Sequence, residues 1–300
     1  MIPKTIMAQR LLFIYNPHSG QGKIKAHLSD IIDIMIKAGF EVTVYVTQAK
    51  SDAVGRVAES AAQFDRIVVS GGDGTLDEAV TGLMQAGVKM PIGYIPSGST
   101  NDFASSVGIS TDMTAAAKVA VGDTVFPCDA GGFNEDYFVY VAAFGLFTEA
   151  SYATSQEMKN MLGHAAYILE GVKQLAEIPA YRMQVEHDGN VIYGEFVYGM
   201  VTNSISIGGI KGLIAEDVGL SDGLFEVTLI KMPRNPIELS EILAFFTNFN
   251  RDTELVYSFQ TRKVRFTSEQ QVPWTLDGEF GGEHEIVTIK NLPEAMGILI

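Results

Sequence analysis

The chain of 300 residues has only one cysteine, Cys128, and only five histidines. A single cysteine excludes an intrachain disulfide and any zinc or iron–sulfur site built from several cysteines. The histidines show no paired ligand spacing, so a histidine-built metal site is not expected either. Long apolar runs are also missing. The uncharged stretches 138–147 and 196–210 are shorter or more polar than the roughly 20 apolar residues of a membrane-spanning helix. These absences suit a cytoplasmic protein with no transmembrane segment.

Positive charge is scarce as well, with 21 Lys and Arg against 36 Asp and Glu, a net charge of −15. Nonspecific nucleic-acid binding depends on neutralising phosphates, so we expect no nucleic-acid partner. Residues 1–127 contain 10 basic and 12 acidic residues, whereas residues 128–300 contain 11 and 24. This difference between the halves, together with the length, favours two domains. The hydrophobic content of 47% is ample for a folded core in each of them.

Strands and helices alternate in the first half of the chain. The apolar run 11–15 predicts a strand, and apolar residues between Leu28 and Ile36 recur at helical spacing, with Gly39 placed to end that helix. The same kinds of pattern predict further strands at 42–46, 67–69 and 92–95, and further helices at 52–63, 76–86 and 113–121. Alternation of this kind predicts a doubly wound, mostly parallel α/β sheet over residues 1–127.

Strands outnumber helices after about residue 128. Asp188-Gly189 is a hairpin-turn signal between two apolar stretches that we predict to be strands at 181–187 and 191–201. Other predicted elements are strands at 225–230, 255–260, 263–266 and 285–289, and helices at 156–176 and 236–249. We therefore predict a mostly antiparallel β domain over residues 128–292. The C-terminal tail, from about 293 to 300, is expected to pack back onto the first domain.

Three loops, 16–20, 71–75 and 96–102, follow predicted strands. Ligands of open α/β sheets bind at this carboxyl edge, where glycines let backbone N–H groups approach a phosphate. A single Gly-Gly or Ser-Gly sequence often makes only a tight turn, but three such loops together favour phosphate binding. Gly22-Lys23 is followed by Ile24, so there is no Walker A motif, and no G-x-G-x-x-G follows a strand.

The motifs of these loops resemble a known family. The matching blocks are Asn16-Pro17-x-Ser19-Gly20, Gly71-Gly72-Asp73-Gly74-Thr75, Pro96-x-Gly98-x-x-Asn101-Asp102-Phe103-Ala104 and Leu276-Asp277-Gly278-Glu279. They closely resemble the diacylglycerol kinase catalytic domain, in the soluble bacterial branch related to sphingosine and ceramide kinases. The second block alone is shared with NAD kinases, whereas the first and third are specific to lipid kinases. The resemblance implies an α/β nucleotide-binding domain, a β-sandwich-like domain and an active site in the cleft between them.

The resemblance also assigns roles to individual residues. Expected contacts with ATP or with the acidic, magnesium-linked network around it are Asn16, Pro17, His18, Ser19, Gly20, Thr47, Gly72, Asp73, Gly74, Thr75, Leu76, Asp77, Glu78, Ser99, Asn101 and Asp102. Asp129 matches another acidic member of that network. Gly219, Asp222 and Leu224 match a structural magnesium site. One departure is Ser105-Ser106, which stand where relatives commonly carry an arginine.

Asp277 matches the proposed general base of the family, with Glu279 beside it. Phosphoryl transfer needs a group that accepts the hydroxyl proton, and a carboxylate is suitable. The spacing does not decide between the two carboxylates, and Asp277-Gly278 alone would be read as an ordinary hairpin turn. The family blocks around it favour a catalytic role.

The function expected from the resemblance is transfer of the γ-phosphate of ATP to a lipid hydroxyl with Mg²⁺, with diacylglycerol giving phosphatidic acid as the leading reaction. The alternatives are another lipid alcohol, an NAD kinase-like enzyme and a nucleotide sensor without catalysis. The lipid substrate implies reversible association with the inner face of the membrane, for which Lys159 and the amphipathic helix predicted around it are candidates. A homodimer is also compatible with the sequence.

Overall fold

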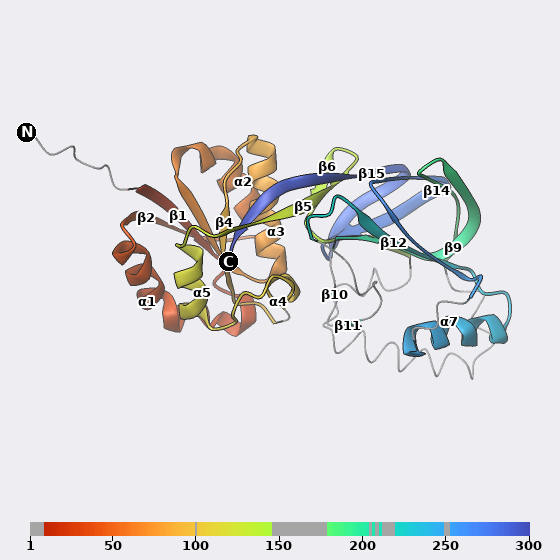
Figure 1. Cartoon of the computed structure of the whole chain (residues 1–300), viewed down its shortest axis with the longest axis horizontal. Helices are drawn as coiled ribbons and strands as arrows, with labels where there is room; N and C mark the ends of the chain where they lie inside the picture. The colour runs from red at the N-terminus through yellow and green to blue at the C-terminus, as the bar shows by residue number, and fades with distance from the viewer. Residues whose placement is uncertain are drawn as a thin grey trace, which may run out of the picture. The chain divides into compact units, whose positions relative to one another are not determined.

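The computed structural model describes residues 9–99, 101–145, 179–203, 206–207, 210–211, 220–248 and 253–300 (Figure 1). The chain divides into two compact units. The first unit comprises Met1–Cys128 with Glu294–Ile300, and the second comprises Asp129–Pro293. The chain passes from the first unit to the second within strand β5 (Val125–Phe133) and returns within strand β15 (Glu279–Leu299).

The first unit contains four parallel strands in the order β2-β1-β3-β4. Their bounds are β1 Gln9–Tyr15, β2 Phe40–Val46, β3 Arg66–Gly71 and β4 Ile92–Pro96. The inner strands β1 and β3 are almost continuously apolar and buried, as expected for parallel strands covered on both faces. The C-terminal tail adds to this sheet, because Ile298 of β15 pairs in parallel with Ile92.

Helices connect these strands in the first unit. They are α1 Ile24–Lys37, α2 Asp52–Ser60, α3 Asp73–Ala86, α4 Asp102–Ser106 and α5 Met113–Ala120, with short 3-10 turns η1 Ser19–Gly22 and η2 Ala61–Gln63. Helix α1 packs beside α5, and α2 packs beside α3 (Figure 1). The predicted apolar face of α1 is buried at Ile31 and Met35, but Ile36, in the last turn, is 56% exposed. Asp112 caps α5, and its hydrogen bond from Thr114 lowers the pKa of its carboxyl.

The second unit is rich in antiparallel strands, in the order β13-β12-β9-β7-β14-β15, with β8 pairing both β9 and β14. The bounds are β6 Asp136–Phe138, β7 Val141–Gly145, β8 Tyr181–His187, β9 Asn190–Thr202, β10 Ser206–Ile207, β11 Ile210–Lys211, β12 Phe225–Lys231, β13 Val256–Thr261 and β14 Lys263–Leu276. One helix, α7 (Pro236–Asn248), coincides with the helix expected at 236–249. The helix expected at 156–176, with Lys159, lies outside the described residues.

Aromatic side chains fill the core of the second unit. The ring of Trp274 lies 4.8 Å from Phe144, 5.1 Å from Phe266 and 5.2 Å from Phe133, measured between centroids. All four side chains are almost completely buried. Their contacts, made largely edge to face, hold strands from distant parts of the chain together.

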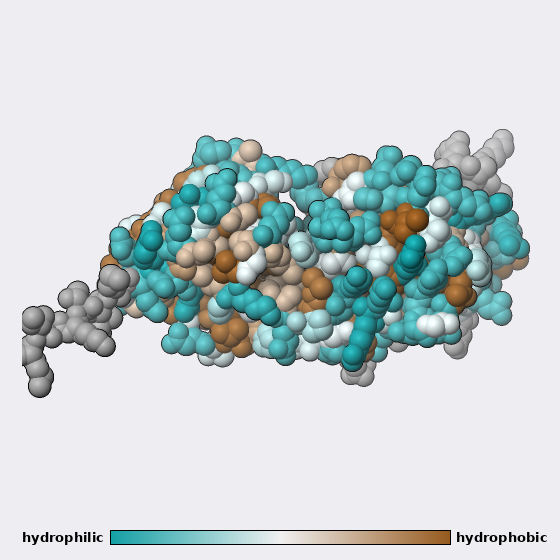
Figure 2. Space-filling view, turned by 90° about the horizontal axis from the view of Figure 1, so that it is seen from above, coloured by the Kyte–Doolittle hydropathy of each residue, from teal (hydrophilic) through white to brown (hydrophobic). Residues whose placement is uncertain are grey.

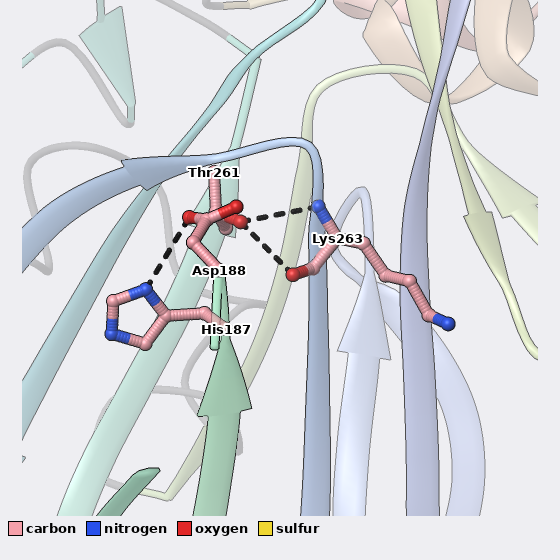
Figure 3. Close-up of polar contacts among 4 residues, drawn as sticks. All are labelled: His187, Asp188, Thr261 and Lys263. Carbon is pink, nitrogen blue, oxygen red and sulfur yellow. Dashed lines mark hydrogen bonds and ion pairs between the residues drawn. The ribbon is translucent and has the colours of Figure 1, made fainter. Parts of the chain in front are cut away.

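Tight turns set the register of the second unit. Asp188 and Gly189, between β8 and β9, have φ values of 45° and 80°, the left-handed pair that a two-residue hairpin turn requires. Figure 3 shows His187 facing the Asp188 carboxylate, with Nδ1 and Oδ2 3.5 Å apart. It also shows the Thr261 hydroxyl, which accepts from the N–H of Lys263 and donates to the carbonyl of Lys263 between β13 and β14.

Hydrophilic side chains cover most of the face drawn in Figure 2, and hydrophobic ones form separate spots on it. The exposed large hydrophobic residues are spread over both units: Ile36, Val44, Val125, Val191, Tyr193, Ile237, Phe280, Ile286 and Ile300. Among the described residues, no helix combines the length and the apolar character needed to cross a membrane.

Candidate active site

The three predicted loops of the first unit lie together at the carboxyl ends of β1, β3 and β4. The N–H of Asn16 donates to the carbonyl of Ser70 at 2.9 Å, and the N–H of Ser97 donates to that of Gly71 at 2.8 Å. Parallel strands end at a common edge, so loops 55 and 80 residues after the first come into contact with it. The structure thus brings the three family blocks of this unit into one place.

Glycines allow the three loops to touch. Gly20 has φ 52°, and a Cβ atom there would lie 2.0 Å from the carbonyl oxygen of Ser97. A Cβ atom on Gly98 would lie 2.6 Å from the Cα of Gly72. No side chain larger than hydrogen fits at these two positions without displacing backbone. The glycines therefore serve close backbone contact.

Helix α3 begins in the middle of this cluster. Its N-cap residue is Gly72, which has no side chain to cap the first N–H groups, and Gly74 in the first turn faces open space. A helix start without a side-chain cap carries partial positive charge, which favours an anion. Thr75 in the same turn is buried against Gly71. The local arrangement suits a phosphate group.

Two polar side chains hold the loops in shape. The Oδ1 of Asp73 accepts from the N–H of Phe103 at 3.2 Å, which links the second loop to the start of α4. Asn101 has φ 53°, and its side chain accepts from the N–H of Gly98 at 2.8 Å and donates to the carbonyl of Gly98 at 3.0 Å. Asp102 begins α4, but its side chain is not among those described.

Other predicted ATP contacts differ in how accessible they are. His18 and Ser99 are exposed, and Asn16, Pro17, Ser19 and Asp77 are half-buried. Leu76 is 1% exposed, so its side chain belongs to the core and only its backbone is available to a ligand. Thr47 is also buried, with its hydroxyl 3.5 Å from the carbonyl oxygen of Tyr15.

Glu78 has a structural partner that the sequence did not indicate. Its carboxylate accepts from the N–H of Ser51 at 2.9 Å and from the N–H of Ala53 at 3.1 Å. These donors belong to the first turn of α2, where Ser51 itself makes no side-chain cap. Glu78 therefore caps α2 from α3.

In the second unit, Asp277 and Gly278 form the turn between β14 and β15. Their φ values are 49° and 89°, and Leu276 pairs with Glu279 across the turn. The Asp277 carboxylate accepts from the backbone N–H groups of Val139, Tyr140 and Val141. A carboxylate offers about four acceptor positions, so three of those on Asp277 are already used. Glu279 follows two residues later in β15 and is half-buried.

Asp129 is the first residue of the second unit and is fully buried. Its Oδ2 accepts from the N–H of Gly223 at 2.7 Å, and its own N–H donates to the carbonyl of Leu220 at 2.8 Å. It therefore fastens the turn at 220–224, in which the exposed Asp222 accepts from the N–H of Leu224 at 2.9 Å. Gly219, the third predicted magnesium ligand, lies outside the described residues.

Two asparagines that the sequence analysis missed also contact this turn. Nδ2 of Asn203 donates to the carbonyls of Asp129 and Leu220, at 3.0 and 3.5 Å. Nδ2 of Asn291 donates to the carbonyl of Leu224 at 3.3 Å. Each asparagine is distant in sequence from the turn and belongs to no motif, so no local signal could have found them. In the described ranges, no three His, Cys, Asp or Glu side chains gather as a metal site.

Comparison with known families divides the chain in a similar way. Residues 10–132 match the family described as "Diacylglycerol kinase catalytic domain". Residues 141–300 match the family described as "YegS C-terminal NAD kinase beta sandwich-like domain". The two matches together span both units.

Whole proteins of similar sequence carry the name diacylglycerol kinase. The one from Bacillus subtilis (strain 168) is 34% identical over 281 residues, which cover 91% of each chain. The one from Staphylococcus carnosus (strain TM300) is 32% identical over 280 residues, which cover 92% of this chain and 90% of the other. A crystal structure from Bacillus anthracis str. Sterne, assigned to the diacylglycerol kinases, has a TM-score of 0.79 at 25% identity and covers 98% of this chain and 97% of its own.

Proposed function

The chain belongs to the diacylglycerol kinase family and is an ATP-dependent lipid kinase, and we propose that it phosphorylates the free hydroxyl of diacylglycerol to give phosphatidic acid. The observation that carries the proposal is the contact of the three loops around the uncapped start of α3, in a chain that also retains the Asp277–Glu279 block. Phosphoryl transfer depends mainly on positioning and on stabilising charge, and this arrangement provides both.

The phosphates of ATP belong at the start of α3. Gly20 and Gly98 let the three loops come together there, and the dipole of α3 favours a negative group at its N-terminus. Asp73 and Asn101 act here through the loops that they hold in shape. The prediction that ATP and lipid react in a cleft between the two domains is part of this proposal.

The proton of the lipid hydroxyl goes to Glu279, and Asp277 positions the hairpin that carries it. Accepting a proton at Asp277 would weaken contacts with three backbone N–H groups, which favour an ionised acceptor. Glu279 lies on the same hairpin, one residue beyond the turn. The sequence left the choice between these carboxylates open, and the hydrogen bonds of Asp277 support Glu279.

The magnesium ion that the family implies would be held at the turn 220–224. The carboxylate of Asp222 and the carbonyl of Leu224 would be its donors, because oxygen ligands suit a hard divalent ion. When bound, the ion would supply positive charge beside the buried Asp129. We expect Asp222→Asn to abolish calorimetric binding of Mg²⁺ by the nucleotide-free protein, whereas wild-type affinity in that variant would remove Asp222 as a ligand.

The lipid must come from a bilayer, and we propose weak, reversible association with an anionic membrane surface. The net charge of −15 opposes general attraction, so a local basic and apolar patch is required. The candidate patch around Lys159 lies outside the described residues. A homodimer also stays a prediction.

A substrate panel tests the proposed function. The purified chain is incubated with γ-labelled ATP, Mg²⁺ and, separately, diacylglycerol, ceramide, sphingosine, a polyprenol or NAD, and the products are separated. We expect label in phosphatidic acid and none with Asp73→Ala. Preference for another lipid alcohol would correct the substrate, label in NADP would favour the NAD kinase alternative, and no transfer to any acceptor would favour a nucleotide sensor.

A further inference from the structure

In the described part of the second unit, two asparagines each have a buried side-chain oxygen without a hydrogen-bond partner. These atoms are Oδ1 of Asn203, a residue only 2% exposed, and Oδ1 of Asn291. A buried amide oxygen without a donor costs free energy, and such an atom in a folded protein usually marks a water or an ion. We therefore expect a water molecule or an ion beside each of these two oxygen atoms.

The amide orientations are fixed by the partners of the nitrogens. Nδ2 of Asn203 faces the carbonyl oxygens of Asp129 and Leu220, and Nδ2 of Asn291 faces the carbonyl oxygen of Leu224. Turning either amide over would place its oxygen against a carbonyl oxygen, which is repulsive. The unpartnered atoms are therefore acceptors, and what fills the space must be a donor or a cation.

The two asparagines bracket the same turn. Asn203 holds its first residue, Leu220, and Asn291 holds its last, Leu224. Between them, Gly223 donates to the buried carboxylate of Asp129. The side chains of Asp129, Asn203 and Asn291, from three separate segments, thus hold the backbone of the turn 220–224. The two asparagines each have an Oδ1 atom that accepts no hydrogen bond.

We propose that Asn203 and Asn291 complete the divalent-cation site at 220–224, with each Oδ1 accepting a hydrogen bond from a water molecule on the ion. Mg²⁺ keeps several of its waters when it binds protein, and these waters need acceptors. Groups in this outer position commonly set metal affinity. The inference rests on the proposed binding of Mg²⁺ at the turn 220–224. It extends that site to Asn203 and Asn291, which belong to none of the family's sequence motifs.

Titration calorimetry with MgCl₂ on the full chain, without nucleotide or lipid, tests the proposal. Asn203→Leu and Asn291→Leu remove the oxygens at nearly constant volume and should each weaken Mg²⁺ binding about 10–100-fold. Thr202→Val is the matched control, since Thr202 is fully buried beside Asn203 and donates to the carbonyl of Tyr140 at 2.6 Å. This control should lower the melting temperature and leave Mg²⁺ affinity unchanged.

A further variant separates the oxygen from the amide donor. Asn203→Asp keeps an oxygen and adds charge but loses the donor to the carbonyls of Asp129 and Leu220, so Mg²⁺ affinity at or above wild type would support the proposal. An Mg²⁺ affinity as low as in Asn203→Leu would overturn it, because loss of the hydrogen bonds that the Asn203 amide donates to backbone carbonyls would then explain the effect. Wild-type affinity in both leucine variants would also overturn it. If Asn203→Leu does not fold, the half-buried Asn291 decides the question. A wild-type chain that binds no Mg²⁺ would instead refute the metal assignment itself, whatever its kinase activity.

Discussion

At the scale of single residues, we propose different roles for two carboxylates only two positions apart. Asp277 has a left-handed backbone in a turn and accepts from three successive N–H groups, 136 to 138 residues earlier in the chain. Glu279 lies on the strand that follows. A carboxylate that accepts from three backbone donors is well placed to organise a loop, which is why we propose the catalytic role for Glu279.

Asp277→Asn should therefore destabilise the protein, and Glu279→Gln should slow catalysis. Asparagine would turn its NH₂ toward an N–H donor, and an unsatisfied buried donor costs about 1–3 kcal/mol. Glutamine at 279 cannot take the proton, so kcat should fall about 10²–10⁴-fold at unchanged stability. Urea unfolding and initial rates measure both effects. A stable but inactive Asp277→Asn, beside an active Glu279→Gln, would return the role of base to Asp277.

Gly20 is another residue whose role depends on backbone geometry. Gly20→Ala should weaken ATP binding and lower stability, because the new methyl group would overlap the carbonyl oxygen of Ser97 in a left-handed conformation. Gly87→Ala is the control, since Gly87 has φ 64° but open space around it. We expect the nucleotide dissociation constant, measured by calorimetry, to rise for Gly20→Ala alone. An equal rise of the nucleotide dissociation constant in both variants would show that the left-handed backbone, and not the contact with Ser97, makes glycine necessary for ATP binding.

At the scale of elements, helix α2 depends on its neighbour. Ser51 is at its N-cap in a left-handed conformation that makes no side-chain cap, and Glu78 of α3 supplies the acceptor. The two helices also pack closely, since a Cβ atom on Gly82 would lie 2.7 Å from the Val57 side chain. The cap and the packing together couple α2 to α3, the helix at whose start we propose that the phosphates bind.

Glu78→Ala should lower the free energy of unfolding by about 0.5–2 kcal/mol, the range for loss of a helix cap. Its kcat should stay near the wild-type value if capping is the main role of Glu78. The control is Glu59→Ala, an exposed residue near the end of α2, which should change stability by less than about 0.5 kcal/mol. Urea unfolding, analysed with the same dependence of free energy on urea concentration for each variant, gives the free energies of unfolding. A large rise in the KM for ATP with normal stability would support the ATP contact predicted from the family.

At the scale of the whole molecule, charge limits how the protein can approach its substrate. The chain carries −15 overall, and the described helices include none suited to crossing a membrane. Among the described residues, exposed large hydrophobic side chains lie on several helices and strands of both units. We therefore propose that access to lipid depends on a local feature and not on the average surface.

Binding to anionic vesicles should be weak, reversible and reduced by salt. Lys159→Glu should lower activity on phosphatidylglycerol vesicles more than activity in neutral detergent micelles, because one cation near an anionic surface contributes on the order of 1 kcal/mol. Vesicle sedimentation and paired rate measurements test this. A conservative Lys159→Arg should behave like wild type, and an equal loss of activity in vesicles and micelles would contradict a membrane role for Lys159.

The sequence by itself determined the features that depend on short stretches of chain. Alternating apolar periods predicted the strands and helices around the phosphate loops, and Asp188-Gly189 predicted a tight hairpin. The family blocks identified a lipid kinase, which the relatives confirm. Such signals are local, because helix period, strand alternation and turn chemistry are set by residues near one another.

Only the tertiary structure decided which partner each polar side chain meets. Glu78 reaches the start of α2, Asp277 holds a loop far earlier in the chain, and Asn203, just after β9, contacts the same turn as Asn291 of β15. These contacts depend on strand register and helix packing, and a shift of one residue in register would point each side chain to the opposite face. No local pattern carries that information, so the chemistry of the site could be predicted from sequence but its hydrogen bonds could not.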